Sequence, residues 1–174
     1  MIQKPIMAQP KPVDNLNEVQ LMKTAIAAAY EAGKAIMEVY ESGDFDSVLK
    51  SDLSPLTRAD RVSHDIISTM LALTRIPMLS EEDSEMDYHK RKEWNRFWLV
   101  DPLDGTKEFL NRNGEFTVNI ALIEDGVAVF GVIQAPVPDV LWWGDLAHGA
   151  RVHLGRDHGR GRIGAHAAGV GAFV

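Results

Sequence analysis

The stretch that most constrains this chain covers residues 98–109 and reads Trp-Leu-Val-Asp-Pro-Leu-Asp-Gly-Thr-Lys-Glu-Phe. An apolar run ends there in two carboxylates, Asp101 and Asp104, and a Gly105-Thr106 pair follows at once. Burying carboxylates is unfavourable unless they are paired or bind a ligand. The pattern therefore predicts a buried strand whose end brings two acids to a place where metal ions and a phosphate meet.

The composition is that of an ordinary soluble globular protein, with 45% hydrophobic and 25% charged residues in 174. Eighteen Lys and Arg against 25 Asp and Glu give a net charge of −7, which argues against a nucleic acid polymer as partner. A small phosphorylated substrate remains compatible with this charge if bound cations invert the local field. Cysteine is absent, so disulfides and thiolate sites are excluded.

No targeting or membrane segment is expected from the sequence. Residues 1–12 contain lysines and prolines without a continuous apolar core, which is not the pattern of a signal peptide. No stretch approaches the roughly 18 apolar residues of a transmembrane segment. A cytoplasmic protein is the default expectation, with a peripheral location at the inner membrane face left open, and the oligomeric state is not predicted.

The periodicity predicts an α+β fold in which an antiparallel sheet packs with two N-terminal helices. Gly33 falls within the first helix, where close packing would explain it, and Thr57 is a candidate N-cap for the second. Residues 124–126 supply a hairpin turn. We expect helices over 16–40 and 57–73, a short strand at 47–50, and strands at 76–79, 94–100, 116–123, 127–135 and 140–143.

Four acids stand at the ends of these elements: Asp60, Glu81, Asp101 and Asp104. Oxygen donors without nearby Cys or His suit Mg²⁺, and two such ions about 3.5–4 Å apart can clamp a displacement at phosphorus. Two simpler interpretations remain open. Asp60 could complement the dipole at a helix start, and Asp104 could be the N-cap of a turn. The six histidines show no ligand spacing, and we assign them no role.

Three segments together resemble the inositol monophosphatase superfamily of magnesium-dependent phosphatases. Residues 101–106 (Asp-Pro-Leu-Asp-Gly-Thr) are similar to its DPxDGT signature, residues 79–83 to its acidic strand end, and residues 54–60 to its SPxTxAD segment. Residues 107–109 and 113–122 resemble the 3'(2'),5'-bisphosphate nucleotidase branch (CysQ-type). The resemblance covers about residues 18–149.

The resemblance implies the removal of the 3'-phosphate of adenosine 3',5'-bisphosphate to give AMP, with two or more Mg²⁺ ions. It implies that Asp60 and Thr106 activate the attacking water, and that Glu82 supports Glu81 from outside the metal shell. Lys50 and Asp52 lie near the site in the family, and we interpret them as solvated loop charges. The implied metal ligands are Glu81, Asp101, Leu103 (through its carbonyl) and Asp104, and the implied substrate contacts are Glu81, Leu103, Asp104, Gly105 and Thr106.

The chain also departs from the superfamily, which has a second α/β half containing a WDxAAG aspartate. Residues 143–149 echo that motif, but the added glycine and early position make Asp145 a decoy. We therefore expect a flexible tail over 1–15, an N-terminal domain of a metal-dependent phosphatase over 16–149, and an atypical tail over 150–174 that reflects truncation or a frameshift. An inositol monophosphatase-like sugar-phosphate phosphatase and an inactive metal-binding fragment are the alternatives.

Overall fold

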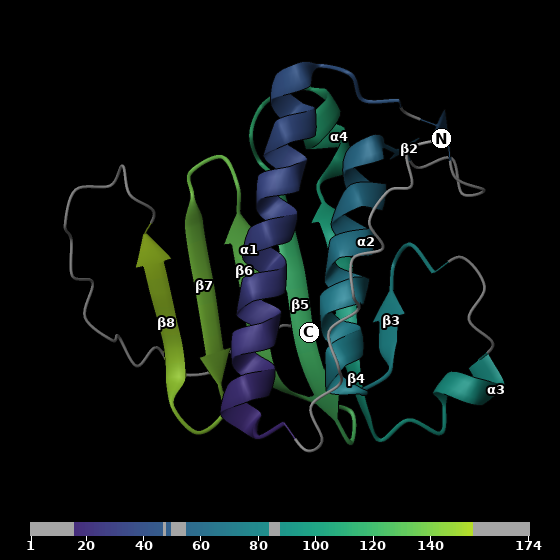
Figure 1. Cartoon of the computed structure of the whole chain (residues 1–174), viewed down its shortest axis with the longest axis vertical. Helices are drawn as coiled ribbons and strands as arrows, with labels where there is room; N and C mark the ends of the chain where they lie inside the picture. The colour runs from purple at the N-terminus through teal and green to yellow at the C-terminus, as the bar shows by residue number, and fades with distance from the viewer. Residues whose placement is uncertain (1–15, 47, 50–54, 84–87, 155–174) are drawn as a thin grey trace, which may run out of the picture.

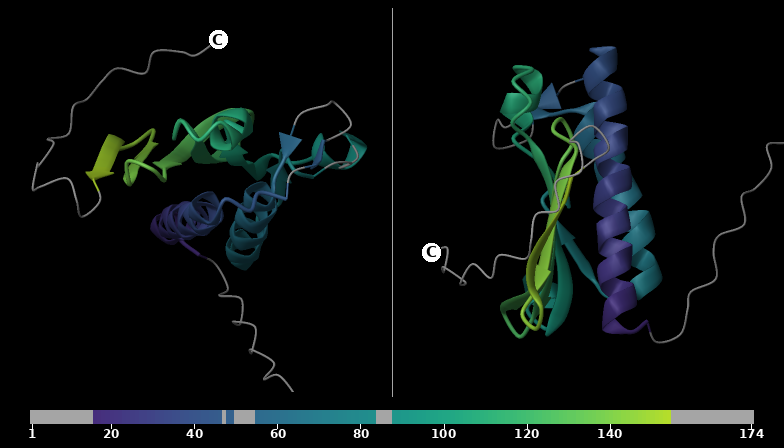
Figure 2. Two further views of the ribbon diagram at one scale, coloured as in Figure 1. Left: turned by 90° about the horizontal axis from the view of Figure 1, so that it is seen from above. Right: turned by 90° about the vertical axis from the view of Figure 1, so that its left-hand side faces the viewer.

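Two helices lie side by side on one face of a six-stranded sheet (Figures 1 and 2). The computed structural model describes residues 16–46, 48–49, 55–83 and 88–154. The helices are α1 (Glu18–Ser42) and α2 (Arg58–Leu71), as the sequence predicts. The shorter elements are β1 (Val48–Leu49), β2 (Pro55–Leu56), η1 (Ala72–Thr74), α3 (Tyr88–Arg91) and α4 (Thr106–Leu110).

The sheet has the order β3-β4-β5-β6-β7-β8, so neighbours in space follow the chain. All pairs are antiparallel except β3 with β4, which run parallel. The α+β fold with two covering helices is confirmed, but the sheet is mixed rather than wholly antiparallel, because the segment between β3 and β4 crosses over and returns in the same direction. The strands are β3 (Met78–Ser80), β4 (Arg96–Asp104), β5 (Thr117–Glu124), β6 (Val127–Ala135), β7 (Val140–Asp145) and β8 (Gly149–Leu154).

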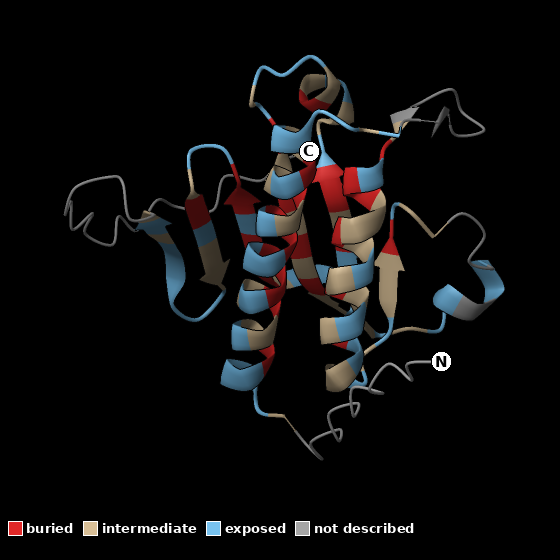
Figure 3. Cartoon of the chain, turned by 45° about the horizontal axis from the view of Figure 1, so that its top comes forward, coloured by how far each residue is buried: buried red, intermediate tan, exposed pale blue. Residues whose placement is uncertain are grey.

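The core lies between the helices and one face of the sheet (Figure 3). Alternation along the strands sorts side chains onto two faces. The row Val100, Ile120 and Val132 is buried under the helices. On the opposite face Leu99 and Ile133 remain 44% and 46% exposed. The described residues therefore form a two-layer unit in which they leave apolar side chains on one face of the sheet exposed.

Close packing explains the glycine inside α1. The helix begins at an Asn17 capping box and ends at Gly43, whose φ of 72° is left-handed. A Cβ built on Gly33 would lie 2.0 Å from Oε1 of Gln134 on β6. The expectation of a close contact at this glycine is confirmed, and the contact is between helix and sheet.

The strand predictions hold for β5, β6 and β7, although β7 continues to Asp145. Asp125 (φ 48°) and Gly126 (φ 80°) form the predicted β5–β6 turn. Strand β8 was not predicted, because its alternation carries small and charged side chains. The domain limits stay a prediction, and residues 1–15 and 155–174 lie outside the described residues. Within the described ranges, no helix has the length and apolar character to cross a bilayer.

Candidate metal and phosphate site

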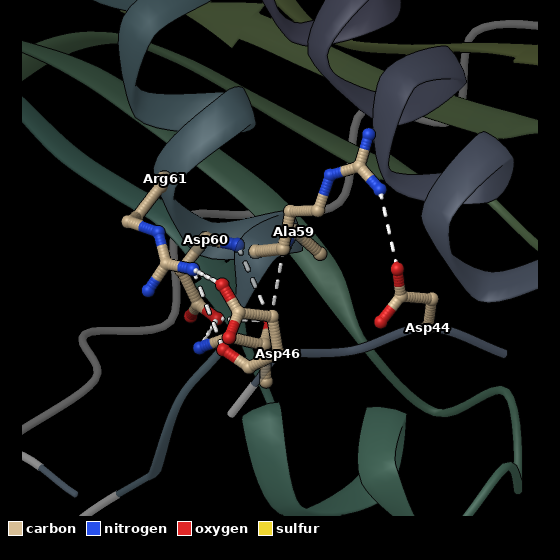
Figure 4. Close-up of polar contacts among 7 residues, drawn as sticks. Asp44, Asp46, Ala59, Asp60 and Arg61 are labelled. Atoms are coloured by element: carbon tan, nitrogen blue, oxygen red, sulfur yellow. Dashed lines mark hydrogen bonds and ion pairs between the residues drawn. The ribbon is translucent and has the colours of Figure 1, made fainter. Parts of the chain in front are cut away.

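Asp60 begins α2 with one carboxylate oxygen engaged in a capping box. Its Oδ2 accepts hydrogen bonds from the Thr57 backbone N–H at 2.7 Å and from Thr57 Oγ1 at 2.5 Å. Thr57 Oγ1 in turn accepts from the N–H groups of Ala59 and Asp60. Figure 4 shows these contacts at the start of the helix. The simple interpretation of Asp60 as a helix-start acid is thus confirmed for this oxygen.

The second oxygen of Asp60 points to another segment. Thr106 Oγ1, at the start of α4, lies 3.2 Å from Asp60 Oδ1 and 3.3 Å from the Leu103 carbonyl oxygen. Asp60 is only 1% exposed. Burial raises the pKa of its carboxyl group above the ordinary value, and hydrogen bonds from Thr57 and Thr106 offset part of that rise. Thr106 therefore donates to a buried carboxylate, and in such a pair the carboxylate of Asp60 can accept a proton from the hydroxyl group.

The two arginines at the start of α2 are bound to loop acids outside the buried pair. Arg61 Nη2 lies 2.7 Å from Asp46 Oδ2, and Arg58 Nη1 lies 3.8 Å from Asp44 Oδ2 (Figure 4). Both contacts are solvent-exposed and contribute little to stability. Neither arginine therefore contributes to the shift in the pKa of Asp60.

Glu81 and Asp101 come together at the neighbouring ends of β3 and β4. The Glu81 backbone N–H donates to the Val100 carbonyl at 3.0 Å, and the Leu103 N–H donates to Asp101 Oδ1 at 3.2 Å. Burial, the negative charges of Glu81 and Asp104, and a hydrogen bond with Glu81 raise the pKa of Asp101 to about 7. Like charges held this close favour either a proton or a bound cation.

Asp104 does not cap α4, so the N-cap interpretation is wrong. The N-cap residue is Gly105, which makes no side-chain capping bond and has a left-handed φ of 94°. Asp104 is exposed, and its Oδ2 accepts a hydrogen bond from Asn119 Nδ2 at 3.1 Å. A Cβ on Gly105 would lie 2.8 Å from the Glu115 carbonyl oxygen. Glycine at 105 is therefore required by the backbone itself.

Strand β4 continues through the two acids and does not end before them. Asp101 pairs with Asn119 and Asp104 with Thr117, with a register shift between the two pairs. The sequence predicts the strand end at Val100, because the apolar run stops there and the two acids follow. The irregular pairing between Asp101 and Asp104 accommodates the proline inside the strand.

Two residues of α2 that sequence reasoning missed also contact this end of the sheet. Ser63 Oγ donates to the Pro102 carbonyl at 2.6 Å, and His64 Nδ1 lies 3.0 Å from Ser80 Oγ. Both follow Asp60 by three or four positions, which places all three on one side of the helix. That spacing was the available signal. One face of α2 therefore touches β3, β4 and α4.

Most of the chain matches one known protein family. The inositol monophosphatase family matches residues 17–157. The chain belongs to the inositol monophosphatase family.

Relatives of this chain within the family are nucleotidases of the CysQ type. It is 53% identical over 117 residues to the 3'(2'),5'-bisphosphate nucleotidase CysQ of Escherichia coli K12, which is 66% of this chain and 47% of that protein. The crystal structure of CysQ from Bacteroides thetaiotaomicron matches with a TM-score of 0.72 and 45% identity, over 90% of this chain and 55% of that one. The predicted resemblance is confirmed, and the chain spans about half the length of these relatives.

Structures further away in the family share the same half of the fold. The extragenic suppressor protein suhB of Bartonella henselae matches with a TM-score of 0.68 and 32% identity, over 76% of this chain and 51% of that one. The mixed six-stranded sheet with two main helices thus corresponds to about half of an inositol monophosphatase structure.

The donors at the end of β3 and β4 fit a hard divalent cation, as expected in a metal-dependent family. They are carboxylates and the main-chain carbonyl of Leu103, without nitrogen or sulfur. The pKa of Asp101 is raised by burial and by the neighbouring negative charges of Glu81 and Asp104, which a bound cation would offset. Among the described residues, no three His, Asp or Glu side chains are grouped closely enough to hold a metal ion as they stand. Lys50 and Asp52 lie outside the described residues.

Asp145 has a local role at the turn between β7 and β8. Its Oδ1 accepts from the N–H groups of Ala147 and His148 and lies 2.8 Å from His148 Nδ1. Slight burial raises the pKa of Asp145, but hydrogen bonds from His148 and Ala147 outweigh it and lower the pKa below its ordinary value. Asp145 thus stabilises the turn, and its interpretation as a decoy for the WDxAAG aspartate stays a prediction.

Proposed function

We propose that this chain carries the first half of a magnesium-dependent phosphatase site that removes the 3'-phosphate of adenosine 3',5'-bisphosphate to give AMP. The observation that carries the proposal is that two pairs of side chains each include one residue of the 101–106 segment. Asp60 contacts Thr106 from α2, and Glu81 contacts Asp101 across β3 and β4. The substrate class comes from the CysQ relatives, which are at least half identical over the matched region in Escherichia coli and Salmonella typhimurium.

The carboxylates and one carbonyl would hold the cations. Glu81, Asp101 and Asp104 would bind through side-chain oxygens and Leu103 through its carbonyl, with Glu82 supporting Glu81. Bound cations would supply charge neutralisation for the phosphate and for the attacking oxygen. The raised pKa of Asp101 is consistent with this role, because a cation would replace the proton that the carboxylate pair otherwise favours.

Thr106 and Asp60 would act on the attacking water. Asp60 Oδ1 accepts a hydrogen bond from Thr106 Oγ1. The hydroxyl oxygen can therefore accept a hydrogen bond from a water molecule, take a proton from it and pass its own proton to the carboxylate. Proton transfer of this kind typically contributes about 10²–10⁴ in rate. The backbone at Gly105 and Thr106, together with Glu81, Leu103 and Asp104, would contact the phosphate. No covalent enzyme intermediate is needed.

Phosphate release with Mg²⁺ tests the proposal on two substrates. Adenosine 3',5'-bisphosphate should release phosphate faster than inositol 1-phosphate, and Asp104→Asn should lose the release while Asp145→Asn keeps it. Faster release from inositol 1-phosphate would favour the sugar-phosphate phosphatase. No release from either substrate, with Asp104→Asn binding Mn²⁺ as well as the parent, would leave only the inactive fragment and contradict the assignment of Asp104.

We propose the activity of the full-length relatives only for the site described above. The matched region is about half of each relative, so the proposal concerns only the part of the site that the described residues form. The partner is a small phosphorylated substrate, and the proposal places the protein in the cytoplasm.

A further inference from the structure

The turn that carries Glu81 receives little support from the sheet. Strand β3 has three residues and lies at the edge, where it pairs only with β4. Beyond the strand, the Glu81 N–H still donates to the Val100 carbonyl at 3.0 Å. The following residues leave the sheet, so other contacts must fix the direction of the turn.

A buried serine organises this turn. Ser80 is 4% exposed, and its Oγ accepts a hydrogen bond from the Glu82 N–H at 3.3 Å. The Ser80 N–H donates to Asp83 Oδ2 at 3.1 Å, and the Asp83 N–H returns to the Ser80 carbonyl at 3.2 Å. Ser80 and Asp83 thus enclose Glu81 and Glu82 from both sides.

His64 connects this closed turn to α2. Its Nδ1 lies 3.0 Å from Ser80 Oγ, and its Nε2 lies 3.9 Å from Asp83 Oδ1. Because Ser80 Oγ already accepts from Glu82, its own proton is available for Nδ1. The other ring nitrogen, Nε2, faces Asp83. One imidazole therefore contacts both ends of the turn.

His64 lies on the same helix as the buried Asp60. Asp60 and His64 are four residues apart on α2, so they occupy the same side of the helix one turn apart. A rigid helix then sets the spacing between the Asp60–Thr106 pair and the turn at Glu81. Sequence reasoning assigned His64 no role, since the ring has no metal-ligand spacing.

We propose that His64 is a positioning residue that ties the Ser80–Asp83 turn to α2 and thereby holds the Glu81 carboxylate beside Asp101. That this position of Glu81 serves to bind a divalent cation rests on the proposed function. The positioning itself rests only on the hydrogen bonds above. His64 binds neither cation nor substrate in this proposal.

Three variants of the full chain test the role of the ring. His64→Ala removes both contacts of the turn, whereas His64→Asn keeps an acceptor near the place of Nδ1. His148→Gln is the matched control, because His148 also contacts an aspartate, at the turn between β7 and β8. Amide hydrogen exchange by NMR reports the turn directly, and exchange in β5 reports whether each variant is folded.

In His64→Ala, we expect the amides of Ser80 and Glu82 to exchange about five- to tenfold faster while those of β5 are unchanged. We expect the affinity for Mn²⁺, measured by EPR titration, to fall about tenfold in the same variant, as for other residues that orient metal ligands. His64→Asn should restore most of both values, and His148→Gln should match the parent.

Unchanged exchange at Ser80 and Glu82 in His64→Ala would overturn the proposal, as would faster exchange with unaltered Mn²⁺ affinity. Failure of His64→Asn to restore either value would also overturn it, since the ring would then act by packing alone. A parent chain that binds no Mn²⁺ would instead contradict the proposed function, and the exchange comparison would still decide whether His64 holds the turn.

Discussion

The two carboxylate oxygens of Asp60 have different partners, so one oxygen stabilises the helix start and the other is available for the proposed chemistry. Oδ2 serves the start of α2 through Thr57, while Oδ1 faces Thr106. A capping box alone would be satisfied by the first oxygen. The contact with Thr106 brings a hydroxyl from a segment 46 positions away to a buried carboxylate.

Asp60→Asn should separate these two roles. One amide oxygen can still accept from Thr57, so we expect a loss of only about 1 kcal/mol in the free energy of unfolding. Phosphate release should fall at least about 100-fold, because an amide cannot take a proton from Thr106. Urea unfolding and phosphate assays measure the two quantities. Thr57→Ser keeps the cap and the carboxylate and should keep the activity; an equal loss in both variants would argue against a proton-accepting Asp60.

Asp101 should make stability depend on pH in the absence of divalent cations. Its pKa rises from 3.8 in a solvated chain to about 7 in the folded one. Between these pH values the folded state holds a proton that the unfolded state has released. The contribution of Asp101 to the free energy of unfolding is therefore greatest below about pH 4 and falls as the pH rises toward about 7.

Asp101→Asn should remove this dependence. In EDTA at pH 8 we expect the variant to be more stable than the parent by about 1–2 kcal/mol, allowing for solvent screening of a half-buried group. At pH 4 the two should be equal. Unfolding titrations at both pH values check this, with Asp125→Asn in the exposed β5–β6 turn as the control. A variant that is less stable than the parent at pH 8 would contradict the carboxylate pairing.

At the scale of elements, α2 is the part that assembles the candidate site. Asp60, Ser63 and His64 contact α4, β4 and the end of β3 in turn. The amphipathic pattern predicted the helix and its cap, since both depend on neighbours within a few residues. The three polar contacts were not predicted from it, because each depends on how the helix packs on the sheet.

The contact between α1 and β6 should limit what can replace Gly33. Alanine would gain about 1 kcal/mol of helix propensity, but its Cβ would meet the Gln134 side chain, which is only 3% exposed. We expect a net loss of about 1–3 kcal/mol from overpacking. Thermal unfolding of Gly33→Ala measures this, and Gln134→Ala in the same chain should recover part of the loss.

Gly131→Ala is the matched control for that substitution, because a Cβ there would meet nothing within 4 Å. It should change stability by less than Gly33→Ala does. A Gly33→Ala chain as stable as the parent would show that the Gln134 side chain moves aside freely, contrary to its buried position.

At the scale of the whole molecule, the uncovered face of the sheet is the main feature. A groove of about 790 Å³ lies on it, lined by polar residues that include Glu81, Asp101 and Asn119 and by apolar residues such as Leu99 and Ile133. Contiguous exposed apolar surface of this kind marks a contact area.

The purified chain should therefore self-associate through this face. Replacing Leu99 and Ile133 together with Gln should shift sedimentation toward monomer and reduce the fluorescence of a bound hydrophobic dye. Val19→Gln is the control, since Val19 is 52% exposed on α1, away from this face. Equal sedimentation of the double variant and the parent would exclude this face as the contact.

The sequence by itself determined α1, α2, the strands β5 to β7, the α+β class and the family, because capping, periodicity and the residue 101–106 motif act over short stretches of chain. Only the tertiary structure decided that β4 passes through both acids, that Asp104 is not a cap, and that Glu81 raises the pKa of Asp101. It also decided that Ser63 reaches Pro102 39 positions away. These features depend on how separate segments approach one another, and packing of α2 on the sheet sets that approach.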